Sequence, residues 1–195
     1  VTRSDYINLC YRMPSKFGKI KRANVVQDTD SFKRNLNIYI LSENIDGNFT
    51  QANSVLKQNL KTWLSSKRMI NDTIDILDAS IINYGIEFEI LVDLNMNRFE
   101  VLENCVEFLK DNFLNVKHGM GEVVNISEIF KMLNDVPGVT DTTSVKLVNK
   151  VGGDYSNFVY DMDENLSADG RLLLVPEDAV VEILLPDQDI TGTVK

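Results

Sequence analysis

A short motif occurs twice in this chain, near its start and again 123 positions later. Each copy is an amphipathic segment of helical pattern that meets a proline and turns into a strand. The first runs from Thr2 through Pro14 to Val26, and the second from Asn125 through Pro137 to Val148. Proline ends a helix because it lacks a backbone donor, and the motif carries no reactive group. One such corner is common, but two in matching register indicate a repeated architectural element.

The start of each copy has the spacing of a capping box. Thr2 stands three residues before Asp5, and Asn125 three residues before Glu128. Side chains at this spacing can accept hydrogen bonds from the N–H groups that the first helical turn leaves without partners. The spacing therefore predicts two capped helices.

The end of each copy predicts a structural turn. We expect Pro14 and Pro137 to end their helices, and Gly138 to adopt a positive φ that a larger residue would strain. Between Pro14 and the next glycine, Gly18, the first copy has three additional residues.

The composition is that of a globular protein with a sizeable core. The chain has 195 residues, of which 44% are hydrophobic and 25% charged, enough for one large domain with or without a small extension. No apolar run approaches the ~20 residues that cross a bilayer, and the start lacks the features of a secretory signal. Cys10 and Cys105 fall at apolar helix positions, which favours buried thiols.

The charge is unevenly distributed along the chain. Residues 1–68 hold 12 Lys and Arg against 5 Asp and Glu, whereas residues 69–195 hold 8 against 24, for a net charge of −9. This asymmetry would suit a subunit whose basic region meets the acidic region of a neighbour, unless folding mixes the two halves. The acidic total argues against nucleic acid or an anionic membrane as the main partner.

Hydrophobic periodicity predicts an α+β fold. The first two predicted strands, Lys19–Gln27 and Asn35–Leu41, would form a hairpin. Two further strands are predicted over Thr73–Asp78 and Ile86–Asp93, with a bend or bulge at Gly85. The predicted helices are Gln51–Arg68, capped by Thr50, and Asn97–Phe113, capped by Asn97 with Glu100. Two ββα units would thus form a mostly antiparallel sheet with helices on one face, together with a helix–strand corner and a small β-rich C-terminal extension.

The pattern predicts a domain over residues 1–150 and a β-rich extension over 151–195, separated near Gly152 and Gly153. The extension has apolar positions but few nearby residues that could bury them, which makes it a candidate arm for assembly. Alternatively, its strands complete the chain's own sheet. The candidate assembly contacts are Phe158, Tyr160, Leu172, Leu174, Ile183 and Leu185.

The residue chemistry gives little support for catalysis. His118, the single histidine, lies among glycines in a predicted loop. The stretch Asp161–Gly170 begins like a calcium loop but has Leu166 where a glycine is needed and is followed by Leu172 where a bidentate glutamate belongs. We expect no catalytic residue, no metal and no cofactor. The enzymatic alternative, a small acidic-site hydrolase, would need a carboxylate pair with one raised pKa.

The order and spacing of several short motifs resemble the C-terminal part of the baseplate J-like family. The motifs lie in Val1–Tyr6, Ala23–Val26, Asn37–Leu41 and Val136–Val139. A narrower set is similar to the baseplate wedge proteins of T-even-type phages: Gly152–Ser156, Asp169–Arg171, Val175–Asp178 and Pro186–Gly192. The additional residues after Pro14 depart from the family's usual Pro-Gly-Val.

The resemblance implies a structural subunit of a contractile-tail baseplate, without cofactor or catalytic residue. It implies a homodimer or ring-type homo-oligomer around the tail hub, with other baseplate wedge proteins as partners and no nucleic acid or membrane. The protein would be assembled in the host cytoplasm and reside in the virion. The alternative is a baseplate component of a non-phage contractile injection machine.

Overall fold

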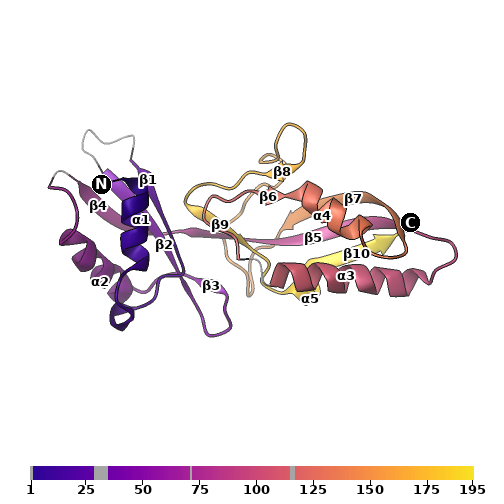
Figure 1. The fold of residues 1–195 in the computed structure, drawn as a ribbon, viewed down its shortest axis with the longest axis horizontal. Coiled ribbons are helices and arrows are strands. Elements are labelled where there is room, and N and C mark those ends of the chain that lie inside the picture. Colours follow the sequence, from indigo (N-terminus) through magenta and orange to yellow (C-terminus); the bar gives the residue numbers. More distant parts are fainter. Residues whose placement is uncertain (1, 29–34, 71, 115–116) are drawn as a thin grey trace. The chain divides into compact units, whose positions relative to one another are not determined.

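A computed structural model describes residues 2–28, 35–70, 72–114 and 117–195 of the chain (Figure 1). It combines helices with mixed sheets, which confirms the α+β class. The chain folds into two compact units. The first comprises Val1–Ile81 with Pro176–Val180, and the second comprises Ile82–Val175 with Val181–Lys195.

The first unit is built on a sheet whose central strand is β2. Its strands are β1 (Arg22–Gln27), β2 (Asn35–Glu43), β3 (Phe49–Thr50) and β4 (Thr73–Asp78). β1 pairs with β2 in antiparallel fashion, with Ala23 opposite Ile40, so the predicted pairing of these strands is confirmed. β4 pairs with β2 in parallel, because a helix between the two strands returns the chain to the same end of the sheet.

Helices α1 (Arg3–Tyr11) and α2 (Ser54–Ser65) and the 3-10 helix η1 (Ser15–Phe17) complete the first unit. The capping box of α1 is confirmed: Thr2 N donates to Asp5 Oδ2 at 2.7 Å, and Asp5 N to Thr2 Oγ1 at 3.3 Å. The predicted cap at Thr50 is wrong, since Thr50 lies in β3. Asn53 caps α2 instead and accepts the Leu56 N–H at 2.7 Å.

Both helices bury one apolar face against the sheet. Leu56, Leu60 and Leu64 repeat at helical spacing along α2 and are buried in the same core as Ile38 and Ile40 of β2. Each such side chain contributes roughly 1.5–3 kcal/mol when fully buried, so this face holds α2 on the sheet.

The second unit has a sheet centred on β5. Its strands are β5 (Ser80–Val92), β7 (Val139–Asn149), β9 (Ala179–Glu182) and β10 (Ile190–Val194), while β6 (Val124–Asn125) pairs with β8 (Leu172–Leu173). β7 runs antiparallel to β5 and β10 runs parallel to it, so Ile86 stands between Leu147 and Ile190. From Ile86 to Ile90, apolar and acidic side chains alternate along β5, and the apolar ones are buried.

Helix α3 (Arg98–Leu114) packs along β10, helix α4 (Ile126–Asn134) packs along β7, and the short helix α5 (Pro186–Asp189) precedes β10. The capping box predicted for α4 is wrong. Asn125 makes no side-chain cap; it lies in β6 opposite Leu172, and Ile126 N donates to the carbonyl of Arg171 at 2.8 Å. Among the described residues, no helix is long and apolar enough to cross a bilayer.

The two units share one arrangement of elements, and the repeated motif is part of it. In each unit the strand after a helix–proline corner pairs antiparallel with the central strand, and a second strand pairs with it in parallel. Thus β1, β2 and β4 correspond to β7, β5 and β10, and α1 and α2 correspond to α4 and α3. The strands that were expected to form one sheet are therefore divided between two.

β5 continues through Gly85, where a bend or bulge was expected. Its irregularities lie further on, between Glu89 and Ile90 and between Leu91 and Val92. Gly85 instead allows another backbone segment to approach β5 closely. A Cβ at Gly85 would lie 2.6 Å from the carbonyl oxygen at position 189, so a side chain there would displace the segment that leads into β10.

The compact units do not divide at residue 150. The chain passes between them within β5, and residues after 150 belong to both units. The strands of the 151–195 segment pair with β6 and β5 of the same chain. These strands complete the chain's own sheets, which is the alternative that the sequence left open, because β5 has an edge that needs a partner.

Candidate interaction surface

Phe158, Val159, Tyr160 and Leu174 form an apolar surface on the second unit, which we call the aromatic surface. Phe158 and Leu174 are exposed, and Val159 has 76% of its surface in contact with solvent. The rings of Phe158 and Tyr160 are stacked, with centroids 6.4 Å apart and planes inclined by 20°. Tyr160 Oη donates a hydrogen bond of 2.7 Å to the Leu174 carbonyl, which joins the two segments.

Two asparagines, Asn83 of β5 and Asn149 of β7, fix the backbone of this surface. Asn149 Oδ1 accepts the Tyr160 N–H at 3.0 Å, and its Nδ2 donates to the Asn83 carbonyl at 3.0 Å. Asn83 Oδ1 accepts the Ser156 N–H at 2.8 Å. Asn83 is only 2% exposed, so these bonds are formed away from water. This asparagine clamp holds the chain on both sides of Phe158.

A surface of this kind is suited to protein contact. Aromatic side chains supply large contact area at a small cost in conformational entropy, and a fixed backbone reduces what must be ordered on binding. Burial raises the pKa of Tyr160, so its hydroxyl remains a neutral donor to the Leu174 carbonyl around neutral pH.

The structure brings together three of the six candidate assembly contacts, namely Phe158, Tyr160 and Leu174. Leu172 lies in β8 opposite Asn125, and Ile183 and Leu185 are half-buried in the segment between β9 and α5. The asparagine clamp was not among the residues predicted from the sequence. A signal for it exists, because Asn83 interrupts the apolar run of β5 between Ile82 and Tyr84.

The predicted turn residues lie at the two corners. Pro14 and Pro137 follow the ends of α1 and α4, and Gly138 has φ +95°. A Cβ on Gly138 would lie 2.6 Å from Met96 Sδ and 2.8 Å from Val101 Cγ2. The second turn therefore packs directly against the connection between β5 and α3.

A buried carboxylate fixes the start of β10. Asp189 is 1% exposed; its Oδ1 accepts the Tyr155 hydroxyl at 2.7 Å and its Oδ2 accepts the Leu185 N–H at 2.9 Å. Burial raises the pKa of Tyr155 to about 12, and the hydrogen bond to Asp189 adds to the shift. Neither residue was a candidate from the sequence.

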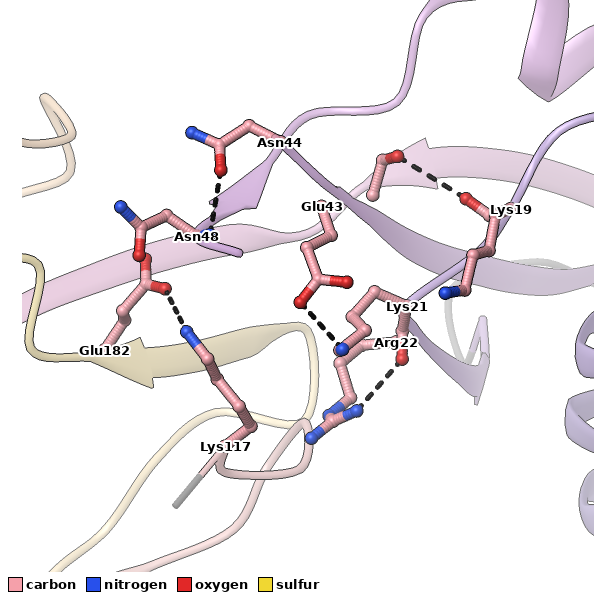
Figure 2. A network of polar contacts seen from close by, with 9 residues as sticks. Lys19, Lys21, Arg22, Glu43, Asn44, Asn48, Lys117 and Glu182 are labelled. Carbon is pink, nitrogen blue, oxygen red and sulfur yellow. Dashed lines mark hydrogen bonds and ion pairs between the residues drawn. The ribbon is translucent and has the colours of Figure 1, made fainter. Parts of the chain in front are cut away.

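Ion pairs connect segments within each unit (Figure 2). In the second unit Lys117 Nζ lies 3.2 Å from Oε1 of the buried Glu182 in β9. In the first unit Lys21 Nζ lies 2.7 Å from Glu43 Oε1, and Arg22 donates to the Lys21 carbonyl at 3.0 Å. These charges have structural partners inside their own unit.

The acidic stretches do not form a metal site among the described residues, where no group of three or more His, Cys, Asp or Glu is placed to hold an ion. In the loop Asp161–Gly170, Asp161 Oδ1 instead accepts the N–H groups of Asp163 and Glu164, each at 3.0 Å. The calcium-like pattern is therefore a turn that the Asp161 side chain holds by its bonds to the backbone. Elsewhere in the second unit, His118 is half-buried in the loop after α3.

The acidic residues around β4 also have separate partners. Asp72 accepts the Tyr6 hydroxyl at 2.6 Å, and Asp78 Oδ2 lies 2.5 Å from Lys57 Nζ. Asp75 is exposed on the strand between them. Lys61 Nζ lies 3.7 Å from Asp75 Oδ1, so each carboxylate faces a different group, and these three do not form the converging pair that an acidic-site hydrolase would need.

Comparison with known proteins gives a likeness in fold. No family model matches the sequence, and no curated protein matches it. Solved structures do match. A chain of the six-fold symmetrised cryo-EM structure of the anti-feeding prophage baseplate aligns with 93% of this chain, with a TM-score of 0.53 and 10% sequence identity. This chain spans 37% of the length of that baseplate chain.

Proposed function

We propose that this chain is a structural subunit of a contractile-tail baseplate and acts through protein–protein contacts. The observation that carries the proposal is the likeness in fold to a baseplate chain over 93% of this sequence. The order of the sequence motifs points to the same class, because it resembles the baseplate J-like family. Motif order and three-dimensional fold are separate kinds of support.

The aromatic surface supports a role in assembly. A stacked aromatic pair beside exposed apolar side chains on a fixed backbone is a typical anchor of a protein interface. Its partners in the proposed function are other baseplate wedge proteins or further copies of this chain, arranged as a dimer or ring around the tail hub. The chain would then reside at the baseplate of the tail after assembly in the host cytoplasm.

The phage baseplate is the first form of the proposal, and a non-phage contractile injection machine is the second. The two forms differ in the proteins that surround the subunit, whereas the kind of protein–protein contact that it makes would be the same in both. We further infer a protein that is not an enzyme and needs no cofactor. This inference is supported by the separate structural partners of Asp72, Asp78 and Asp189.

Tail particles purified from the source that encodes this chain test the proposal. An epitope-tagged chain should sediment with intact particles, and antibody-bound gold should mark the baseplate end in electron micrographs. Particles should fail to form when exposed apolar contacts are removed in Phe158→Ser with Val159→Ser. The matched control, Asp163→Ser with Glu164→Ser, changes two exposed residues of the nearby polar loop. Absence of the tagged chain from pure, complete particles would overturn the proposal.

A further inference from the structure

The two helix–proline corners differ in one place, and the difference creates a surface. In the second corner Gly138 follows Pro137 and β7 begins at once. In the first corner Ser15–Phe17 form η1, and Gly18 closes the turn with φ +117°. The additional residues seen in the sequence therefore make an extra turn, which the fold shared by the two units does not require.

This turn is basic and aromatic. Tyr11, Arg12, Lys16, Phe17 and Lys19 are all exposed on it, and we call them the basic corner. Lys16 Nζ lies 4.8 Å from the centroid of the Phe17 ring, a cation–π contact. Within the part of the chain that the structure describes, no carboxylate forms an ion pair with Arg12, Lys16 or Lys19. The positive charge of the corner is thus available to a partner.

Backbone contacts hold the basic corner in place. Tyr11 Oη accepts the N–H of Ala23 in β1 at 3.0 Å, and the Phe17 carbonyl accepts Asn59 Nδ2 of α2 at 3.0 Å. A Cβ on Gly18 would collide with Leu56 Cδ1, so the turn is seated against α2. The aromatic groups are therefore positioned before any partner binds, which reduces the entropy lost on binding.

The second unit carries a surface of opposite charge on the outer side of α3, which we call the acidic face. Its exposed carboxylates repeat at helical spacing in the order Glu100, Glu103 and Glu107. Like charges three and four residues apart repel and destabilise a helix, so a basic partner would relieve them. Phe99, which is 83% exposed, and Phe108 flank this face.

The charge contrast extends to the whole units. The first unit has 12 Lys and Arg against 10 Asp and Glu, and the second has 8 against 19. Folding reduces the contrast seen between the sequence halves but does not remove it. The long-range field of one copy's second unit therefore favours the first unit of another copy over a polyanion such as nucleic acid.

We propose that the basic corner of one copy docks on the acidic face of α3 in a second copy. The pairing matches three cations with a row of carboxylates, and places Tyr11 and Phe17 against a helix flanked by phenylalanines. Because two different surfaces meet, the contact is heterologous and can repeat around a ring. The proposal deepens the proposed function, on which it rests for the biological setting of this self-association.

A charge-swap experiment on the 195-residue chain tests the contact. Sedimentation velocity should show association that weakens as ionic strength rises from about 50 mM to about 500 mM. The basic-corner variant Arg12→Glu with Lys16→Glu should weaken it at least about tenfold in dissociation constant. The acidic-face variant Glu103→Lys with Glu107→Lys should do the same. Equimolar mixing of the two variants should restore association, because each then offers the complement of the other.

The matched control is Asp163→Lys with Glu164→Lys, which makes the same charge change on another exposed stretch of the second unit. It should leave association unchanged, and circular dichroism should show all variants folded. A monomeric wild-type chain at low salt, or no rescue on mixing, would overturn the proposal. If the charge-swap variants do not associate on mixing but the tagged chain is present in tail particles, only this contact is rejected. If mixing restores association but the tagged chain is absent from the particles, only the baseplate function is rejected.

Discussion

The side-chain amide of Asn149 donates a hydrogen bond of 3.0 Å to the backbone carbonyl of Asn83, across the antiparallel pair β5 and β7. The Lys150 N–H donates to the same carbonyl at 2.9 Å. Asn83 in turn accepts the Ser156 N–H, so one buried residue receives three bonds from the segment that leads to the aromatic surface. The position of this surface therefore depends on a polar residue inside the sheet.

Asn83→Ala should lower the free energy of unfolding by about 1–3 kcal/mol, because it removes a buried acceptor of the Ser156 N–H. Urea unfolding followed by circular dichroism measures the loss. Asn157→Ala, an exposed position in the same segment, is the matched control and should change stability by no more than about 0.5 kcal/mol. Equal effects of the two substitutions would show that the clamp does not stabilise the unit.

Gly138→Val should destabilise the chain by about 1–3 kcal/mol or more. The positive φ strains a β-branched residue, and Met96 and Val101 occupy the space that its Cβ would need. Gly170 also has a positive φ, +67°, but no atom lies within 4 Å of its Cβ position. Gly170→Val should therefore be the milder change in thermal unfolding. A similar loss at both sites would mean that strain alone acts at Gly138.

The sequence was informative wherever one local pattern decides the structure. The range Thr73–Asp78 matches β4 residue for residue, and the Thr2–Asp5 capping box forms as its spacing predicts. The identical spacing at Asn125 fails where pairing of β6 with β8 places Asn125 opposite Leu172 and the Ile126 N–H donates to the distant Arg171 carbonyl. A local rule cannot anticipate a competing partner that arrives from 45 positions away.

Strand pairing could not be predicted from the local pattern either, because the partners come from distant parts of the sequence. β4 and β5 are adjacent in sequence but join different sheets, because α2 carries β4 back beside β2 in parallel. Part of the candidate interaction surface could be predicted from the sequence. Phe158, Tyr160 and Leu174 stand out as apolar positions, whereas the clamp consists of asparagines, which sequence patterns assign to turns.

Tyr155 should make stability depend on alkaline pH. Its folded pKa, about 12, lies above its ordinary value of 10.0, so its contribution is complete below pH 10 and is lost as the pH rises toward 12. Tyr155→Phe should be less stable than wild type at neutral pH, and the difference should shrink above pH of about 10. Urea unfolding of both proteins across this range measures it. A difference that stays constant with pH would exclude this linkage.

Tyr84→Phe should stabilise the chain by about 1 kcal/mol. The Tyr84 side chain is fully buried, and no hydrogen-bond partner for its Oη lies among the residues that the structure describes. A buried hydroxyl without a partner carries a desolvation cost that phenylalanine removes. Tyr160→Phe, which deletes a bond to the Leu174 carbonyl, should act in the opposite direction. A destabilised Tyr84→Phe protein would reveal a polar partner such as bound water.

Removal of residues 190–195 should disrupt the second unit. β10 pairs with β5 from Ile86 to Ile90, and its Ile190 is buried in the core. Without this strand the apolar side of β5 and α3 gains access to water, so cooperative thermal unfolding of the chain should be lost or strongly shifted downward. The control Lys195→Ala removes only an ion pair of 3.9 Å with Glu89, which is worth no more than about 1 kcal/mol. If the shortened chain melts like wild type and fails only in self-association, β10 serves assembly instead of the fold, as the sequence first suggested.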